Sequence, residues 1–125
     1  MDRTLDPVYE LARTRLEAIL DPQGFRLASE YHMPEAFGSA ETEYRRRGLR
    51  VRLTWDGKDR WLWLQVAPTA EKNVHPLPGM WRDLEAAIDV TPTGAYLRED
   101  AVVERRIQEL EHALRSYLAA GERRR

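Results

Sequence analysis

The 125-residue chain contains no cysteine. This absence excludes disulfide bonds, a thiol nucleophile and any metal site built on cysteine ligands. Long apolar runs are also missing, since the longest, such as residues 61–64, span only four residues, whereas a membrane helix needs about 18 residues. The first residues contain no apolar stretch of a secretory signal. The protein is therefore expected to be cytoplasmic, without membrane association.

Glycines are few and isolated. The seven glycines fit neither G-x-G-x-x-G nor G-x-x-x-x-G-K-[ST], so the sequence predicts no phosphate-binding loop. The H-E-x-x-H motif, an EF-hand loop and the G-x-S-x-G nucleophile elbow are absent as well. These absences disfavour phosphoryl transfer and dinucleotide chemistry, and the sequence predicts neither a cofactor nor a metal.

Histidines are the remaining candidates for acid–base chemistry or metal binding. His32 and His75 are predicted to lie in two loops, over 32–39 and 67–79. No spacing in the sequence requires them to meet, and an exposed histidine is the ordinary outcome. A small-molecule binder or enzyme that uses these two loops is therefore a secondary hypothesis.

Lysine is scarce, because 18 of the 20 basic residues are arginine. Arginine is suited to bidentate contacts with phosphate and carboxylate groups. The same chain is rich in alanine and poor in residues with AT-rich codons, which is typical of a GC-rich bacterial genome. The abundance of arginine alone therefore indicates nothing about function, and its placement has to be considered.

Hydrophobic periodicity predicts a single α+β domain over 1–121, followed by a basic tail over 122–125. Capping residues, alternation and turn residues predict a helix, four strands and two helices in that order. Their approximate ranges are 7–20, 25–31, 40–46, 49–55, 60–66, 81–88 and 100–121. Alternation predicts that Leu27, Ser29 and Tyr31 share one strand face. Helical spacing predicts that Trp81, Leu84 and Ile88 share one helix face. Asp6-Pro7 is expected to begin the first helix, and Gly121 is expected to end the last one.

The predicted architecture has two layers: a four-stranded antiparallel meander, covered on one face by the first and last helices. Turns at Arg47-Gly48 and Asp56-Gly57 join the last three strands. With four-residue turns as the working register, Leu53 lies opposite Leu62 and Val51 lies opposite Leu64. Any turn of even length keeps the same residues on the same face, so the faces are predicted more firmly than the register.

The second face of this meander is the one feature that suggests a function. It carries three kinds of side chain on neighbouring strands: Glu41 and Glu43; Arg50, Arg52 and Thr54; Trp61, Trp63 and Gln65. Residues 45–66 contain 7 basic and 2 acidic residues, a net charge of +5, although the whole chain has a net charge of −1. Near-neutrality of the chain therefore hides a basic meander.

We predict that the side chains that bind a partner are Arg47, Arg50, Arg52, Trp61 and Trp63. The leading hypothesis is a non-enzymatic protein-binding module, such as an adaptor, an inhibitor or immunity-like protein, or a self-associating protein. Its partner would be another protein or a second copy of the chain.

Two alternatives stay open for the same face. Arginine and tryptophan together can also bind single-stranded nucleic acid. The arginines can instead be used within the fold, if Glu41 and Glu43 pair with them and their stems cover the tryptophan rings. The interleaved glutamates make nucleic acid the weaker of the binding hypotheses.

Overall fold

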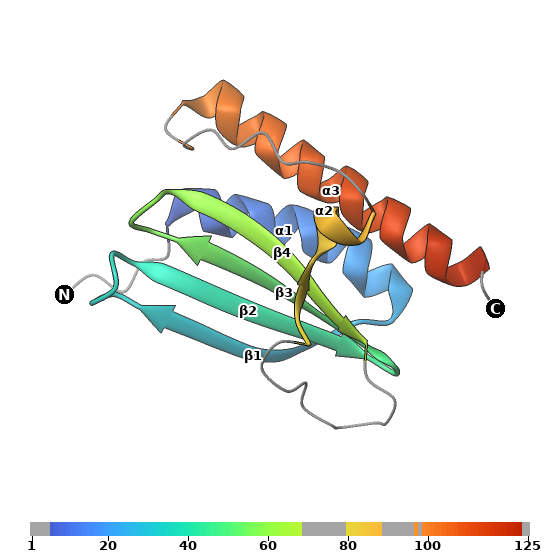
Figure 1. Ribbon diagram of the computed structural model, residues 1–125. Helices are drawn as coiled ribbons and strands as arrows, with labels where there is room; N and C mark the ends of the chain where they lie inside the picture. The colour runs from blue at the N-terminus through green and yellow to red at the C-terminus, as the bar shows by residue number, and fades with distance from the viewer. Residues whose placement is uncertain (1–5, 69–79, 89–96, 98, 124–125) are drawn as a thin grey trace.

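A computed structural model describes residues 6–68, 80–88, 97 and 99–123 (Figure 1). Helices α1 and α3 pack against each other and against one face of an antiparallel sheet with the strand order β1-β2-β3-β4-β5. This confirms the predicted α+β fold and its meander. The elements are α1 (Pro7–Leu20), a 3-10 turn (Asp21–Gln23), β1 (Arg26–Met33), β2 (Ser39–Arg46), β3 (Leu49–Asp56), β4 (Trp61–Pro68), β5 (Arg82–Asp83), α2 (Leu84–Ala87) and α3 (Asp100–Arg123). In these ranges no helix is long and apolar enough to cross a membrane.

Helix α1 begins where the sequence predicts. The side chain of Asp6 accepts a hydrogen bond from the backbone N–H of Val8 at 2.8 Å, and Pro7 occupies the first helical position. Gly24 follows the 3-10 turn with φ of 87°, a left-handed conformation that glycine adopts without strain. The chain can then turn sharply into β1, and Phe25, the residue immediately before this strand, is buried in the core.

The β3–β4 hairpin has the predicted faces but a different register. Leu53 lies opposite Leu64 and Val51 opposite Val66, so the working register is wrong by two residues. The reason lies in Asp56, which stays in the strand opposite Trp61. Its carboxylate accepts hydrogen bonds from two backbone N–H groups of the turn, each at 3.0 Å. A shift of two residues leaves every side chain on its predicted face.

Strand β1 differs from the prediction because of a β-bulge between Leu27 and Ser29. An extra residue in a strand reverses the face of everything beyond it. Leu27 lies opposite the buried Tyr44, whereas Ser29 and Tyr31 lie opposite Glu43 and Glu41 on the other face. The expectation that Leu27, Ser29 and Tyr31 share one face is therefore wrong.

Helix α3 also extends further than predicted. It runs to Arg123, so Gly121 lies inside the helix and does not end it. Gly121 lacks the left-handed φ that a terminating glycine adopts. The first two residues of the predicted tail belong to this helix, and 124–125 lie outside the described residues. Strand β5, which pairs with β4 through two residues, was not predicted.

Polar groups join the helices to the sheet and to each other. The hydroxyl of Tyr9 is hydrogen-bonded to that of Thr42, and Tyr44 donates to a carboxylate oxygen of Glu17 at 2.6 Å. Burial raises the pKa of both tyrosines above the usual value for the residue. Both phenols are therefore held in the neutral form over a wide pH range.

Candidate functional site

The face of the sheet away from the helices, here called the open face, carries side chains in rows across the strands. Residues directly opposite one another in an antiparallel sheet point to the same side. One row contains Tyr31, Glu41, Thr54 and Trp63, and the next contains Ser29, Glu43, Arg52, Gln65 and Asp83. The predicted combination of Glu, Arg and Trp on neighbouring strands is therefore present on this face.

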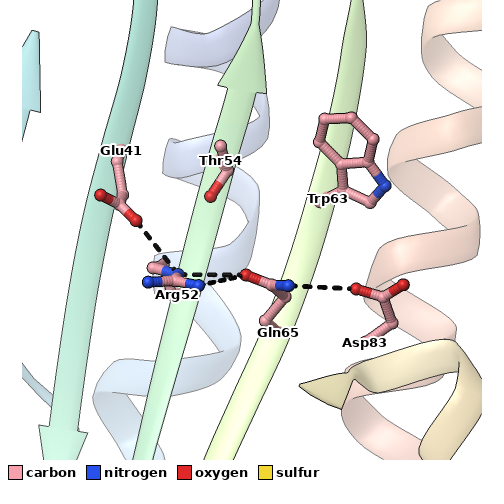
Figure 2. Close-up of a pocket in the computed structure, with 6 residues that line it drawn as sticks. All are labelled: Glu41, Arg52, Thr54, Trp63, Gln65 and Asp83. Atoms are coloured by element: carbon pink, nitrogen blue, oxygen red, sulfur yellow. Dashed lines mark hydrogen bonds and ion pairs between the residues drawn. The ribbon is translucent and has the colours of Figure 1, made fainter. Parts of the chain in front are cut away.

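A concavity of about 470 Å³ lies over these two rows. Its lining residues come from β2, β3, β4 and β5 (Figure 2). We call it the open-face concavity, and it is lined by Glu41, Arg52, Thr54, Trp63, Gln65 and Asp83. Its volume falls within the range of about 300–1,000 Å³ found for small-molecule sites.

A continuous chain of polar contacts crosses the concavity (Figure 2). Arg52 forms an ion pair with Glu41, at 3.1 Å between Nε and Oε1. Its Nε and Nη2 also donate to the side-chain oxygen of Gln65 at 3.1 and 2.6 Å. The amide nitrogen of Gln65 donates in turn to Asp83 at 3.2 Å. We call this row the polar strip, and its one guanidinium already has a carboxylate partner.

Trp81 contacts the arginine of the polar strip, and sequence reasoning missed this contact. The guanidinium of Arg52 lies over the Trp81 ring, 4.2 Å from its centroid. Sequence periodicity instead grouped Trp81 with Leu84 and Ile88 on the apolar face of a helix. That grouping is wrong, because Trp81 precedes β5 and α2 begins only at Leu84. The pattern gave no signal for this contact, which joins residues 29 positions apart.

Arg50 lies in the next row, and it is not accessible there. Its residue surface is only 2% exposed, and its guanidinium is paired with the carboxylate of Glu43. Ala67, directly opposite Arg50 on β4, has no exposed surface. Arg50 and Ala67 are thus buried, whereas Arg45, opposite Arg50 on β2, is exposed, and Arg52 and Trp63 are partly exposed.

Trp61 lies at the start of β4 and is engaged by a buried arginine from α3. The guanidinium of Arg106 is 4.3 Å from the centroid of the Trp61 ring. Arg106 also donates to the backbone oxygen of Leu62 at 3.2 and 2.8 Å and is paired with the buried Glu85 at 2.9 Å. The signal for Arg106 was present in the sequence, because it falls on the apolar stripe between Val103 and Leu110.

Arg47 is separate from the other predicted binding residues. It is exposed at the β2–β3 turn and lines a second concavity of about 420 Å³, which shares no described lining residue with the first. Of the five predicted residues, the structure therefore brings Arg52 and Trp63 together. Arg50 and Trp61 lie on the same face but are occupied by contacts within the protein.

The histidine hypothesis loses one of its premises. His32 does not lie in a loop: it belongs to β1, opposite Ala40. His75 falls outside the described residues, so its proximity to His32 is not tested. Among the residues that the structure describes, no group of three or more potential ligands could hold a metal ion. Comparisons with protein-family models, curated proteins and solved structures found no match for the chain.

Proposed function

We propose that the protein is a non-enzymatic protein-binding module whose open-face concavity receives a segment of its partner. One observation supports this most strongly. Trp63 is partly exposed beside a polar strip in which Arg52 is ion-paired with Glu41 and Asp83 accepts a hydrogen bond from Gln65. Another protein can cover the Arg52–Glu41 pair at a lower electrostatic cost than it could cover an isolated arginine, because neither of the two charges is then desolvated without its partner.

The residue types favour a protein partner. Tryptophan and arginine are the residues most enriched at the energetic centre of protein interfaces. Binding of single-stranded nucleic acid requires cations that neutralise phosphates. On this face Arg50 and Arg52 are each paired with a glutamate, which would repel a phosphate.

The concavity also indicates what kind of group it would accept. An apolar or aromatic side chain can pack on the Trp63 ring. The polar strip uses Oε1 of Glu41 and Oδ1 of Asp83, and each carboxylate has a second oxygen that can accept from a backbone N–H. We therefore expect an exposed loop or extended segment with one apolar anchor between hydrogen-bonding backbone groups.

The test is an affinity capture of partners from nuclease-treated lysate with the full chain as bait. The informative variant is Trp63→Ala, and Leu11→Ala is the matched control. Leu11 is an apolar residue on α1 that is 42% exposed and lies outside the open face. Loss of an interface tryptophan costs about 2 kcal/mol or more. We therefore expect Trp63→Ala to weaken binding of a captured protein about 30-fold, while Leu11→Ala leaves it unchanged.

Two results would overturn the proposal. One is that the wild-type chain and Trp63→Ala capture the same proteins equally well, while circular dichroism shows that Trp63→Ala and Leu11→Ala are both folded. The other is capture that disappears with nuclease and declines steeply with salt, which would favour the nucleic-acid alternative.

A further inference from the structure

Strand β1 forms one outer edge of the sheet, on the side away from β5 (Figure 1). An edge strand presents unpaired backbone N–H and C=O groups and can pair with another chain. Proteins commonly prevent this with proline, charged side chains or a bulge. The eight residues of β1 contain no proline. Of its two charged residues, Arg26 precedes the bulge and Glu30 is ion-paired with Arg13 of α1, and residues 29–33 beyond the bulge are regular.

Exposed apolar side chains concentrate at this same edge. The described residues include five large hydrophobic side chains that are exposed, and three belong to β1 or its hairpin: Leu27 at 52%, Tyr31 at 62% and Phe37 at 69%. Single exposed apolar residues are ordinary, but a group along a free strand edge marks an interaction surface. The edge therefore combines a template for backbone pairing with apolar side chains to bury.

The regular part of β1 is complementary to itself in one register. In an antiparallel pair of two copies, a two-fold axis at Tyr31 sets Glu30 opposite His32 of the second copy and Ser29 opposite its Met33. Each pair then lies on a single face, because Ser29, Tyr31 and Met33 share the open face while Glu30 and His32 point to the helix side. Glu30, which is also ion-paired with Arg13 of α1, meets an imidazole, and the two tyrosines meet each other.

The neighbouring registers are less favourable. An axis at Glu30 places two carboxylates directly opposite one another, which is destabilising. An axis at Ser29 sets Leu27 against Tyr31, but the bulge puts these two side chains on different faces. An axis at His32 requires Pro34, which lies beyond the end of β1.

We propose that the β1 strands of two copies pair antiparallel, with Tyr31 at the two-fold axis. The five described strands of each copy then form one continuous sheet, with both helix layers on the same side. The row of Tyr31, Glu41, Thr54 and Trp63 continues into its equivalent in the second copy. The two open-face concavities therefore share one surface, although the pairing itself does not depend on the proposed function.

The absence of cysteine allows a test by single-cysteine variants. In this register the Cα atoms at position 31 of the two copies are about 4.5–5.5 Å apart, within the range for a disulfide. Positions 29 are separated by four residues along the strands, about 13 Å, which is too far. With copper phenanthroline and oxygen as the oxidant of the two thiols, Tyr31→Cys should form a covalent dimer and Ser29→Cys, on the same face of the same strand, should not.

Light scattering on the chain without cysteine provides the second measurement. Wild type should become dimeric as concentration rises. Tyr31→Lys should stay monomeric at the same concentration, because two ammonium groups would lie directly opposite. The control Leu11→Lys adds the same charge at an exposed site outside the edge and should still dimerise.

Three outcomes would overturn the proposal. The first is a wild-type chain that stays monomeric up to about 1 mM. The second is equal cross-linking of both cysteine variants, and the third is cross-linking of Ser29→Cys alone. The result is separable from the proposed function, since Trp63→Ala should leave the Tyr31→Cys cross-link unchanged.

Discussion

The replacement Arg106→Leu tests how helix α3 holds β4 and α2 in place on the β5 side of the open-face concavity. Arg106 is 2% exposed and connects three elements: α3, which carries it, β4 through the oxygen of Leu62, and α2 through Glu85. Glu85 follows Asp83 of the polar strip by two residues. Loss of Arg106 should therefore destabilise the whole fold and loosen this side of the open-face concavity.

The magnitude follows from burial. Glu85 is only 5% exposed, so removing its partner leaves a buried carboxylate uncompensated. Breaking a buried ion pair from one side typically costs about 3–5 kcal/mol. The oxygen of Leu62 also loses two donated hydrogen bonds, which contributes to the upper part of this range. This is a large fraction of the roughly 5–15 kcal/mol that stabilises a typical domain.

Urea unfolding followed by tryptophan fluorescence measures the loss, with circular dichroism to confirm one transition. The matched control is the double variant Arg106→Leu with Glu85→Leu. Because the buried carboxylate of Glu85 is removed together with its partner, the double variant should be more stable than Arg106→Leu alone; Glu109, which also pairs with Arg106, loses that partner in both variants. A loss below about 1 kcal/mol for the single variant, or a double variant less stable than the single one, would refute the reasoning.

Three further predictions concern the core, a turn and helix α3. Because burial raises the pKa of Tyr9 and Tyr44, the stability that both neutral phenols contribute should be fully present below about pH 10 and fall above it, by at most about 1.4 kcal/mol per pH unit for each tyrosine. Urea midpoints measured between pH 8 and 11 should therefore decline less steeply for Tyr44→Phe, and equal slopes would contradict this. A methyl group on Gly57 would lie 1.9 Å from the backbone oxygen of Phe37, so Gly57→Ala should cost more than about 1 kcal/mol. A methyl group on Gly121 of α3 would meet open space, so Gly121→Ala should instead stabilise the fold by up to about 1 kcal/mol. Thermal unfolding measures both variants, and a higher melting temperature for Gly57→Ala or a lower one for Gly121→Ala would contradict these predictions.

Strand faces were predictable from the sequence because side chains alternate strictly along a regular strand. Alternation placed Arg52, Trp63 and Gln65 on one side of the sheet, and the observed register keeps them there. The register itself was not predictable, since it depends on how the carboxylate of Asp56 binds the turn. The bulge in β1 has no periodic signal either, so the faces beyond Leu27 were assigned wrongly.

The site was predictable only in part, for a related reason. Sequence charge showed a basic meander between acidic segments but left open whether the carboxylates compensate it. The ion pairs of Arg50 with Glu43 and of Arg52 with Glu41 show that compensation occurs on the open face. The contact between Arg52 and Trp81 joins distant parts of the chain, and no local pattern encodes it.

The most direct test of the proposed function is photo-cross-linking from within the open-face concavity. A benzophenone amino acid replaces Thr54, which lies beside Trp63, and the control carries it at Leu11 on α1. Irradiation in cell lysate should give a nuclease-resistant protein adduct from position 54, absent from position 11 and lost when Trp63→Ala is added. No adduct from position 54, the same adduct from both positions, or one that nuclease removes would contradict the proposal.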